Sequence, residues 1–222
     1  LKFLKINMLK TNIKHNNYID KEIRIKNEAF NKNWIATNGF VGKSFLSSDE
    51  LDVNPNIRMD AHSFQVVLLQ NIQRLCKMFE KNYKFNTFKL IDAGCGSGIS
   101  TLFFNQNYNF KSFVGFDFSL KLISFAKQNI KNAICDNFNT STIKFEVSDA
   151  KKIHLPNERL AVFLFNPFGL DTMRIFLSNN IKLMRQNKSV MMYANDQFLD
   201  ELLKFGTLDM RDDFFNLSVI SF

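Results

Sequence analysis

Three glycines at alternate positions follow a short apolar run near the middle of the chain, and this stretch constrains the fold more than any other. The segment from Leu90 to Thr101 reads Leu-Ile-Asp-Ala-Gly-Cys-Gly-Ser-Gly-Ile-Ser-Thr. Glycine has no Cβ and tolerates positive φ angles, so the backbone can turn sharply here and a ligand can lie directly on it. The stretch therefore predicts a strand, a tight ligand-binding loop and the start of a helix.

The spacing of these glycines distinguishes between classes of ligand. The dinucleotide fingerprint needs Gly-x-Gly-x-x-Gly, whereas Gly94, Gly96 and Gly98 fall as Gly-x-Gly-x-Gly. Asp92 stands two positions before the first glycine, and an acid there suits a ligand that carries an ammonium group. Glycine-rich turns also occur simply to pack a strand against a helix, and the spacing leaves that structural reading open.

Acidic residues close two further strand-like segments. Asp117 ends the run Phe113-Val-Gly-Phe-Asp, where an acid can accept both hydroxyls of a ribose, whether the ligand is NAD or another adenosine cofactor. Asp149 closes the alternating segment that begins at Thr142. One acid at a strand end can serve solubility alone, but three in corresponding places indicate a shared ligand site.

The motif acid-x-Gly-x-Gly-x-Gly resembles the first motif of the class I S-adenosylmethionine (SAM) dependent methyltransferases. The resemblance covers roughly Asp60 to Phe205, and the chain is similar in particular to a group of small bacterial methyltransferases of mostly unassigned substrate. It implies SAM as cofactor, with Asp92 near the methionyl amine and Asp149 near the adenine amine. The implied cofactor contacts are Asp92, Gly94, Cys95, Gly96, Gly98, Asp117, Phe118, Asp149, Ala150 and Asn166.

A second motif, Asn166-Pro-Phe-Gly, follows the continuous apolar run of residues 160–165, which is typical of a central parallel strand. Amino-methylating enzymes have a related Asp/Asn-Pro-Pro-aromatic motif that accepts hydrogen bonds from the target NH₂, but Phe168 stands where the second proline would be. We therefore expect methyl transfer to a hydroxyl of a small molecule or saccharide. N-methylation of a nucleic-acid base or protein amine, through Asn166 and Pro167, is the alternative.

A hydroxyl acceptor needs a base to remove its proton. The candidates are His62 and Asp60, just before a predicted helix, and Asp196, just after a predicted buried strand. A capping or surface role is the alternative for His62 and Asp60. An alternative of another class is a SAM-binding regulatory subunit without turnover.

The alternation of strand-like and helix-like segments predicts an α/β fold. We expect a Rossmann-like, doubly wound, mostly parallel sheet with a terminal β-hairpin and an N-terminal helical and loop cap. Residues 1–85 should form this cap and a substrate lid without being an independent domain, and residues 86–222 the SAM-binding core. Within the cap, residues 1–57 read as an approach segment and loops, and the three- and four-residue apolar steps from Phe64 to Phe79 predict an amphipathic helix over residues 60–80.

Two aromatic residues of the approach segment, Trp34 and Phe40, could cover a binding site or anchor a loop to the core. Phe45, further along, has the same two readings. The anchoring role is the simpler expectation for each of them.

The net charge and the cysteines limit which partners and which cellular compartment the sequence predicts. The formal net charge is +8, but the lysines are dispersed, so nucleic acid is left open as a partner and not indicated. Three cysteines without metal-ligand spacing predict reduced thiols, no metal site and a cytoplasmic protein. We expect no membrane span. The sequence leaves open both the oligomeric state and the question whether Met8 is the start.

Overall fold

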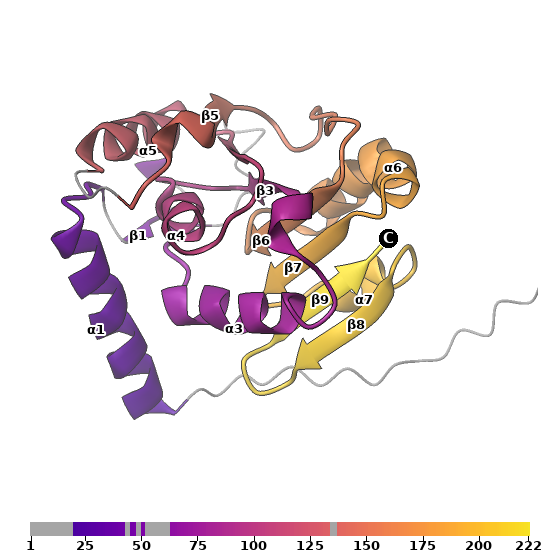
Figure 1. The fold of residues 1–222 in the computed structure, drawn as a ribbon, viewed down its shortest axis with the longest axis horizontal. Helices are drawn as coiled ribbons and strands as arrows, with labels where there is room; N and C mark the ends of the chain where they lie inside the picture. Colours follow the sequence, from indigo (N-terminus) through magenta and orange to yellow (C-terminus); the bar gives the residue numbers. More distant parts are fainter. Residues whose placement is uncertain (1–19, 43–44, 48–49, 52–62, 134–136) are drawn as a thin grey trace, which may run out of the picture.

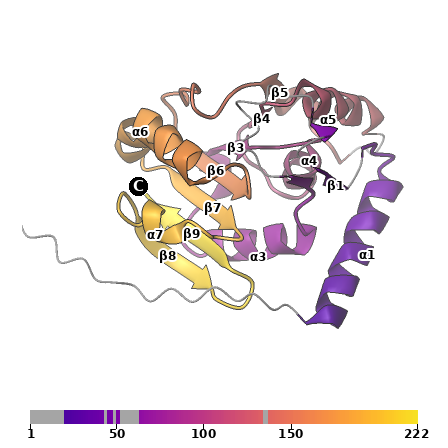
Figure 2. The same ribbon diagram turned by 180° about the vertical axis from the view of Figure 1, so that it is seen from behind.

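The computed structural model describes residues 20–42, 45–47, 50–51, 63–133 and 137–222. Their centre is a seven-stranded sheet in the order β5-β4-β3-β6-β7-β9-β8, as Figures 1 and 2 show from opposite sides. The first five of these strands are parallel, and β9 and β8 are antiparallel to their neighbours. The predicted Rossmann-like sheet with a terminal hairpin is confirmed. The strands are β3 (Lys89–Ala93), β4 (Phe113–Asp117), β5 (Ile143–Val147), β6 (Leu160–Phe165), β7 (Val190–Ala194), β8 (Thr207–Asp212) and β9 (Leu217–Ser221).

Helices cover both faces of this sheet because the buried strands β3, β6 and β7 are apolar on both sides. One face carries α3 (Leu69–Phe79) and α4 (Ile99–Asn107), whose apolar side chains form one core cluster with the sheet. The other face carries α6 (Leu170–Gln186) and the short α7 (Leu199–Leu202) in a second cluster. Figures 1 and 2 show α3 and α6 on opposite sides of the strands.

The strand order indicates where a ligand should bind. From β3 the chain proceeds to β4 and β5 on one side, crossing by α5 (Leu120–Asn132), and then to β6 and β7 on the other. Open parallel sheets bind ligands at such a switch point, outside the carboxyl ends of the strands. The glycine loop after β3 and the Asn166 motif after β6 leave neighbouring strands at this edge.

The helix predicted over residues 60–80 is wrong at its start. Within the described residues α3 begins at Leu69, while Phe64–Gln65 forms the strand β2, paired antiparallel with β1 (Phe45–Leu46). Asn31 accounts for the boundary, because its side chain donates to the carbonyl of Val67 and accepts from the backbone N–H of Leu69. The regular spacing of apolar residues thus begins in an extended segment, before the helix starts. Asp60 and His62 lie outside the described residues.

A helix of 17 residues, α1 (Lys21–Thr37), occupies much of the segment predicted as an approach of loops, and that reading is corrected. Asp20 caps the helix through hydrogen bonds from the N–H groups of Glu22 and Ile23. The residues that α1 buries are Asn27 and Asn31, so its inner face lacks the apolar stripe that would have revealed it. Figure 1 shows α1 at one end of the molecule, beyond α3.

Two aromatic residues, Trp34 in the last turn of α1 and Phe40 just after the helix, anchor α1 to the core, as the simpler reading predicted. The ring of Trp34 packs 5.2 Å from those of Phe40 and Phe103, and its indole N–H donates to Gln106. Phe45 differs, because 54% of it is exposed. The division at residue 85 stays a prediction, although α3 packs directly against β7 and β9. No helix among the described residues has the length and apolarity that crossing a bilayer requires.

Candidate cofactor site

The glycine loop leaves β3 at its carboxyl end and turns through three residues with positive φ. Gly94, Gly96 and Gly98 have φ angles of 75°, 55° and 78°, which other residues adopt at a cost. The backbone N–H groups of Gly94 and Cys95 both donate to the carbonyl of Phe116 in β4. The loop is thereby fixed against the neighbouring strand end.

Each of these glycines also lies where a side chain would collide with a neighbour. A Cβ on Gly94 would be 2.8 Å from the Pro167 side chain, and one on Gly98 would be 2.5 Å from the ring of Phe145. Gly94 therefore lets the loop approach the Asn166 motif, while Gly98 lets α4 begin close to β5. The sequence predicted close approach of a ligand to this loop, and the neighbours that these two glycines have in the structure belong to the protein itself.

Asp92, in β3, is fixed by the first turn of α4. The hydroxyls of Ser100 and Thr101 each donate to its Oδ2 at 2.6 Å. The carboxylate is almost fully buried, and burial raises its pKa from 3.8 to about 6, against the lowering effect of the two hydroxyls. The sequence contained these hydroxyls directly after the glycines, but their role depends on how the helix begins.

Asp117, at the end of β4, lies beside the same loop. Its Oδ2 accepts from the N–H of Gly96 at 3.1 Å and its Oδ1 from the N–H of Ser119 at 2.9 Å. Burial raises the pKa of Asp117 to about 6, and these backbone donors lower it. Asp92 and Asp117 thus flank the glycine loop from two adjacent strands.

Two hollows border this loop. One is lined by Asp92, Gly94, Cys95 and Ser100, and the other by Gly94, Asp117, Phe118, Asn166 and Pro167. The structure therefore brings seven of the predicted cofactor residues to one edge, since Gly96 lies in the same loop. Burial raises the pKa of Cys95 well above its ordinary value, so this thiol is neutral.

The remaining predicted residues lie elsewhere around the site. Gly98 faces Phe145 and Ala126 on the inner side of the loop. Asp149 accepts from the N–H of Lys151 in the turn after β5, and Ala150 is buried in the core cluster under α6. Neither Asp149 nor Ala150 lines the two hollows, so their cofactor role stays a prediction.

Asn166 has a partner that the sequence analysis missed. The parallel register pairs Phe165 with Ala194, so Asn166 and Asn195 follow at neighbouring strand ends, and both have positive φ angles. The side-chain Nδ2 of Asn195 donates to Oδ1 of Asn166 at 2.7 Å. Backbone strain of this kind gathers at functional sites. Finding the pair in the sequence would have required the strand register.

Asp196 is part of a buried ion pair. It is fully buried and receives the guanidinium of Arg211 at 2.8 and 3.1 Å, together with the hydroxyl of Ser218. Both partners come from the terminal hairpin. A carboxylate engaged in this way ties β7 to the hairpin, so the geometry does not favour the predicted role as general base.

The arrangement fits an adenosine cofactor with an amino-acid tail. Glycines without side chains provide the surface, Asp117 can accept from ribose hydroxyls, and Asp92 can accept from an ammonium group. Residues 90–186 match the family model described as a methyltransferase domain. Residues 90–186 therefore form a SAM-dependent methyltransferase domain. It is an enzyme whose cofactor is SAM, and the sulfonium of that cofactor supplies an activated methyl group.

Several solved structures are similar to this chain. A magnesium protoporphyrin IX methyltransferase from Synechocystis PCC 6803 with bound SAM is 14% identical, covers 93% of this chain and 98% of its own, and has a TM-score of 0.48. An RNA methyltransferase from Salinibacter ruber in complex with S-adenosyl-L-homocysteine is 14% identical, with coverages of 68% and 89% and a TM-score of 0.46. An rRNA methylase from Streptococcus thermophilus is 12% identical, with coverages of 70% and 97% and a TM-score of 0.44. Comparison with curated protein sequences gives no match.

Cofactor affinity should depend on pH through the two buried acids. Their pKa values, raised to about 6, mean that both are mostly protonated at pH 5, where Asp92 cannot pair with an ammonium group and Asp117 is a weaker acceptor for ribose hydroxyls. We expect the Kd of S-adenosylhomocysteine, the demethylated product of SAM, to rise about fivefold for each acid between pH 6 and pH 5 and to level off above about pH 7. Isothermal titration calorimetry across this range measures it.

Asp92→Asn is the control for this pH dependence, because it removes one titrating group and should make the slope shallower at a weaker overall affinity. The raised pKa values of Asp92 and Asp117 also make the stability of the ligand-free protein depend on pH. A carboxyl whose pKa is raised on folding stabilises the fold while protonated, so this contribution is lost as pH rises from 3.8 to about 6. A pH-independent Kd in the parent protein would contradict the proposed contacts.

Proposed function

We propose that this methyltransferase transfers the methyl group to a hydroxyl of a small molecule or saccharide. The observation that supports it is the hydrogen bond from Asn195 Nδ2 to Asn166 Oδ1 at 2.7 Å. A target amine would need that oxygen as an acceptor, and the donation from Asn195 already occupies one of its two lone pairs. The Asn166 amide then offers its N–H₂ group, which donates to the oxygen of a hydroxyl acceptor.

The residues after Asn166 support the same reading. Phe168 replaces the second proline of the amine-recognising motif, and its side chain is buried 5.8 Å from the ring of Phe176. It therefore belongs to the core beneath α6 and does not shape the strand end around a planar amine. His62 and Asp60 remain the proposed bases for the hydroxyl proton.

In this proposal the chain's residues orient the acceptor and remove its proton. Asn166 holds the acceptor oxygen at the carboxyl end of β6, and a base takes the proton as the oxygen becomes a nucleophile. Asp92, the glycine loop and Asp117 hold the cofactor beside it. Methyl transfer then requires no covalent intermediate with the protein.

The test uses labelled SAM with cell-extract fractions of saccharides, small molecules, protein and RNA, followed by mass spectrometry of the labelled product. We expect an O-methyl product and a decrease in kcat of about tenfold or more for Asn166→Asp, because a donor is replaced by a charged acceptor. The matched control is Asn187→Asp, at the far end of α6, where the side chain of Asn187 donates to Asn157. This control should leave kcat unchanged.

An amine acceptor would give the opposite pattern. An N-methyl product, with Asn166→Asp active and Asn166→Ala inactive, would contradict the hydroxyl proposal and support N-methylation through Asn166 and Pro167. Binding of S-adenosylhomocysteine to each variant must be measured alongside, so that a loss of cofactor affinity is not mistaken for a loss of catalysis.

A further inference from the structure

The ring of Phe64 lies directly on the glycine loop. A Cβ on Gly96 would fall 2.6 Å from Cδ2 of Phe64, so only a glycine at this position leaves room for the ring. Phe64 comes from β2, outside the central sheet, and packs against a small apolar cluster of Leu46, Leu51 and Leu122. The side-chain-free surface of Gly96, which the fold offers to a cofactor, is covered by the protein's own aromatic ring.

Phe64 also lines both hollows at the carboxyl edge of the sheet. It lies with Asp92 and Ser100 in the first and with Asp117 and Asn166 in the second. Their volumes are about 20 and 30 Å³, which is room for one or two water molecules each. Pockets for cofactor-sized ligands have volumes of roughly 300–1,000 Å³. A ligand that reaches both Asp92 and Asp117 must therefore displace the ring.

The segment that carries Phe64 is held by a short strand pairing to β1 before residue 66 and by hydrogen bonds from α1 after it. Its strand pairs with β1 over two residues, with Leu46 opposite Phe64 and Phe45 opposite Gln65. On the other side, Asn31 of α1 fixes Val67 and Leu69 through two buried hydrogen bonds. A two-residue ladder opens more easily than the central sheet, so Phe64 can withdraw while residues from 67 onward stay in place.

We propose that Phe64 is an internal competitor for the cofactor, so that SAM binds only when the ring withdraws from Gly96. The free protein is then distributed between a covered and an open glycine loop. Its apparent Kd exceeds the intrinsic one by the inverse of the open fraction. The inference concerns the cofactor alone and holds whether the methyl acceptor is a hydroxyl or an amine.

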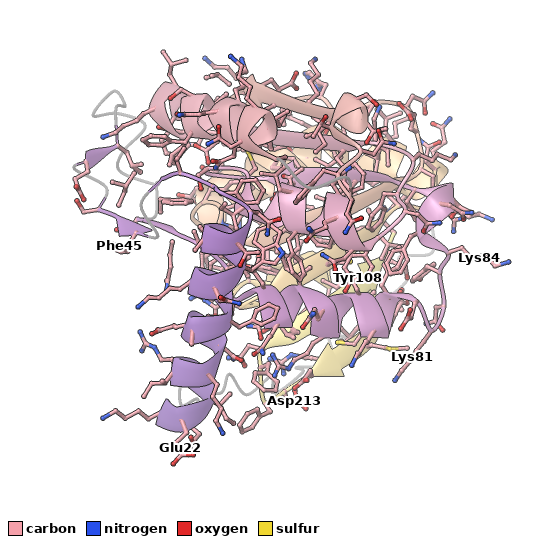
Figure 3. The ribbon with its side chains drawn as sticks, turned by 60° about the vertical axis from the view of Figure 1, so that its left-hand side comes forward. Glu22, Phe45, Lys81, Lys84, Tyr108 and Asp213 are labelled. Atoms are coloured by element: carbon pink, nitrogen blue, oxygen red, sulfur yellow. The ribbon has the colours of Figure 1, made fainter. Side chains whose placement is uncertain are left out.

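The first test compares the parent protein with Phe64→Ala by calorimetry and stopped-flow binding of S-adenosylhomocysteine. We expect Kd to fall about tenfold and the association rate to rise, because the open fraction increases. The matched control is Phe45→Ala, in the same two-stranded sheet, where Figure 3 shows the labelled Phe45 at the outer margin of the molecule and 54% of the residue is exposed. Phe45→Ala should leave both constants unchanged. An equal or larger Kd for Phe64→Ala overturns the proposal.

The second test asks whether the ring lies on Gly96 in solution. Gly96→Ala should lower the melting temperature more in the parent protein than in the Phe64→Ala background, because only the parent has the ring in the way of the new methyl group. Equal decreases in the two backgrounds would show that the ring is elsewhere and would overturn the proposal. Circular dichroism of each variant establishes that it is folded before either comparison.

Discussion

Asp196→Ala is expected to destabilise the protein by about 3–5 kcal/mol, because it leaves the Arg211 guanidinium without its buried carboxylate. The side chain of Asp196 is 0% exposed and that of Arg211 only 8%, and the carboxylate that still pairs with Arg211 in the variant, Asp213, is 80% exposed. At about 2–4 °C per kcal/mol for a chain of this size, the melting temperature should fall by roughly 6–20 °C. Differential scanning calorimetry measures both quantities.

Asp171→Ala is the matched control for this experiment. Asp171 also pairs with an arginine, Arg174, but its side chain is 83% exposed and the closest atoms are 3.6 Å apart. Water screens such a pair, so the melting temperature should hardly change. A folded, stable Asp196→Ala variant with no turnover would instead indicate that Asp196 acts in catalysis, as the sequence first suggested.

Gly94→Ala is expected to have the second large effect, on both stability and cofactor binding. A non-glycine residue at φ 75° costs roughly 1–2 kcal/mol, and overpacking of a filled site costs about 1–3 kcal/mol more. The new Cβ would meet Pro167 Cβ at 2.8 Å and its Cα at 3.0 Å, and the backbone atom cannot turn away. The loop must move, so we expect affinity for S-adenosylhomocysteine to be lost in calorimetric titration.

Gly42→Ala is the control that separates the effect of backbone strain from the effect of a steric collision. Gly42 also has a positive φ, 119°, but a Cβ there would meet Ser97 at an ordinary 3.5 Å. This variant should lose some stability and keep its affinity for S-adenosylhomocysteine. If Gly94→Ala binds as tightly as Gly42→Ala, the loop does not form the cofactor surface described here.

The strands and the glycine loop could be predicted because their signals are local. Continuous apolar runs mark β3, β6 and β7, and the positive φ angles of the loop are available at low cost only to glycine. Asp92 and Asp117 follow from the same local pattern, since parallel strands bring their carboxyl ends to one edge. These features need no knowledge of which strand lies beside which.

The parts that could not be predicted depend on partners far away in the sequence. Asn31 is 36 and 38 residues from the backbone groups that it binds at the start of α3, and a buried asparagine gives no apolar period. Asp196 looked like an available base until the hairpin brought Arg211 to it. The Asn166–Asn195 pair likewise needs the order of β6 and β7, which single-sequence patterns do not contain.

The central claim is that SAM lies on the glycine loop between Asp92 and Asp117. The most direct measurement is a pair of calorimetric titrations of the parent protein at pH 7.5, one with S-adenosylhomocysteine and one with NAD. The account predicts one-site binding of S-adenosylhomocysteine that Asp117→Ala abolishes, and no heat of binding with NAD. Binding of NAD without S-adenosylhomocysteine, or affinity for S-adenosylhomocysteine that Asp117→Ala leaves intact, would contradict it.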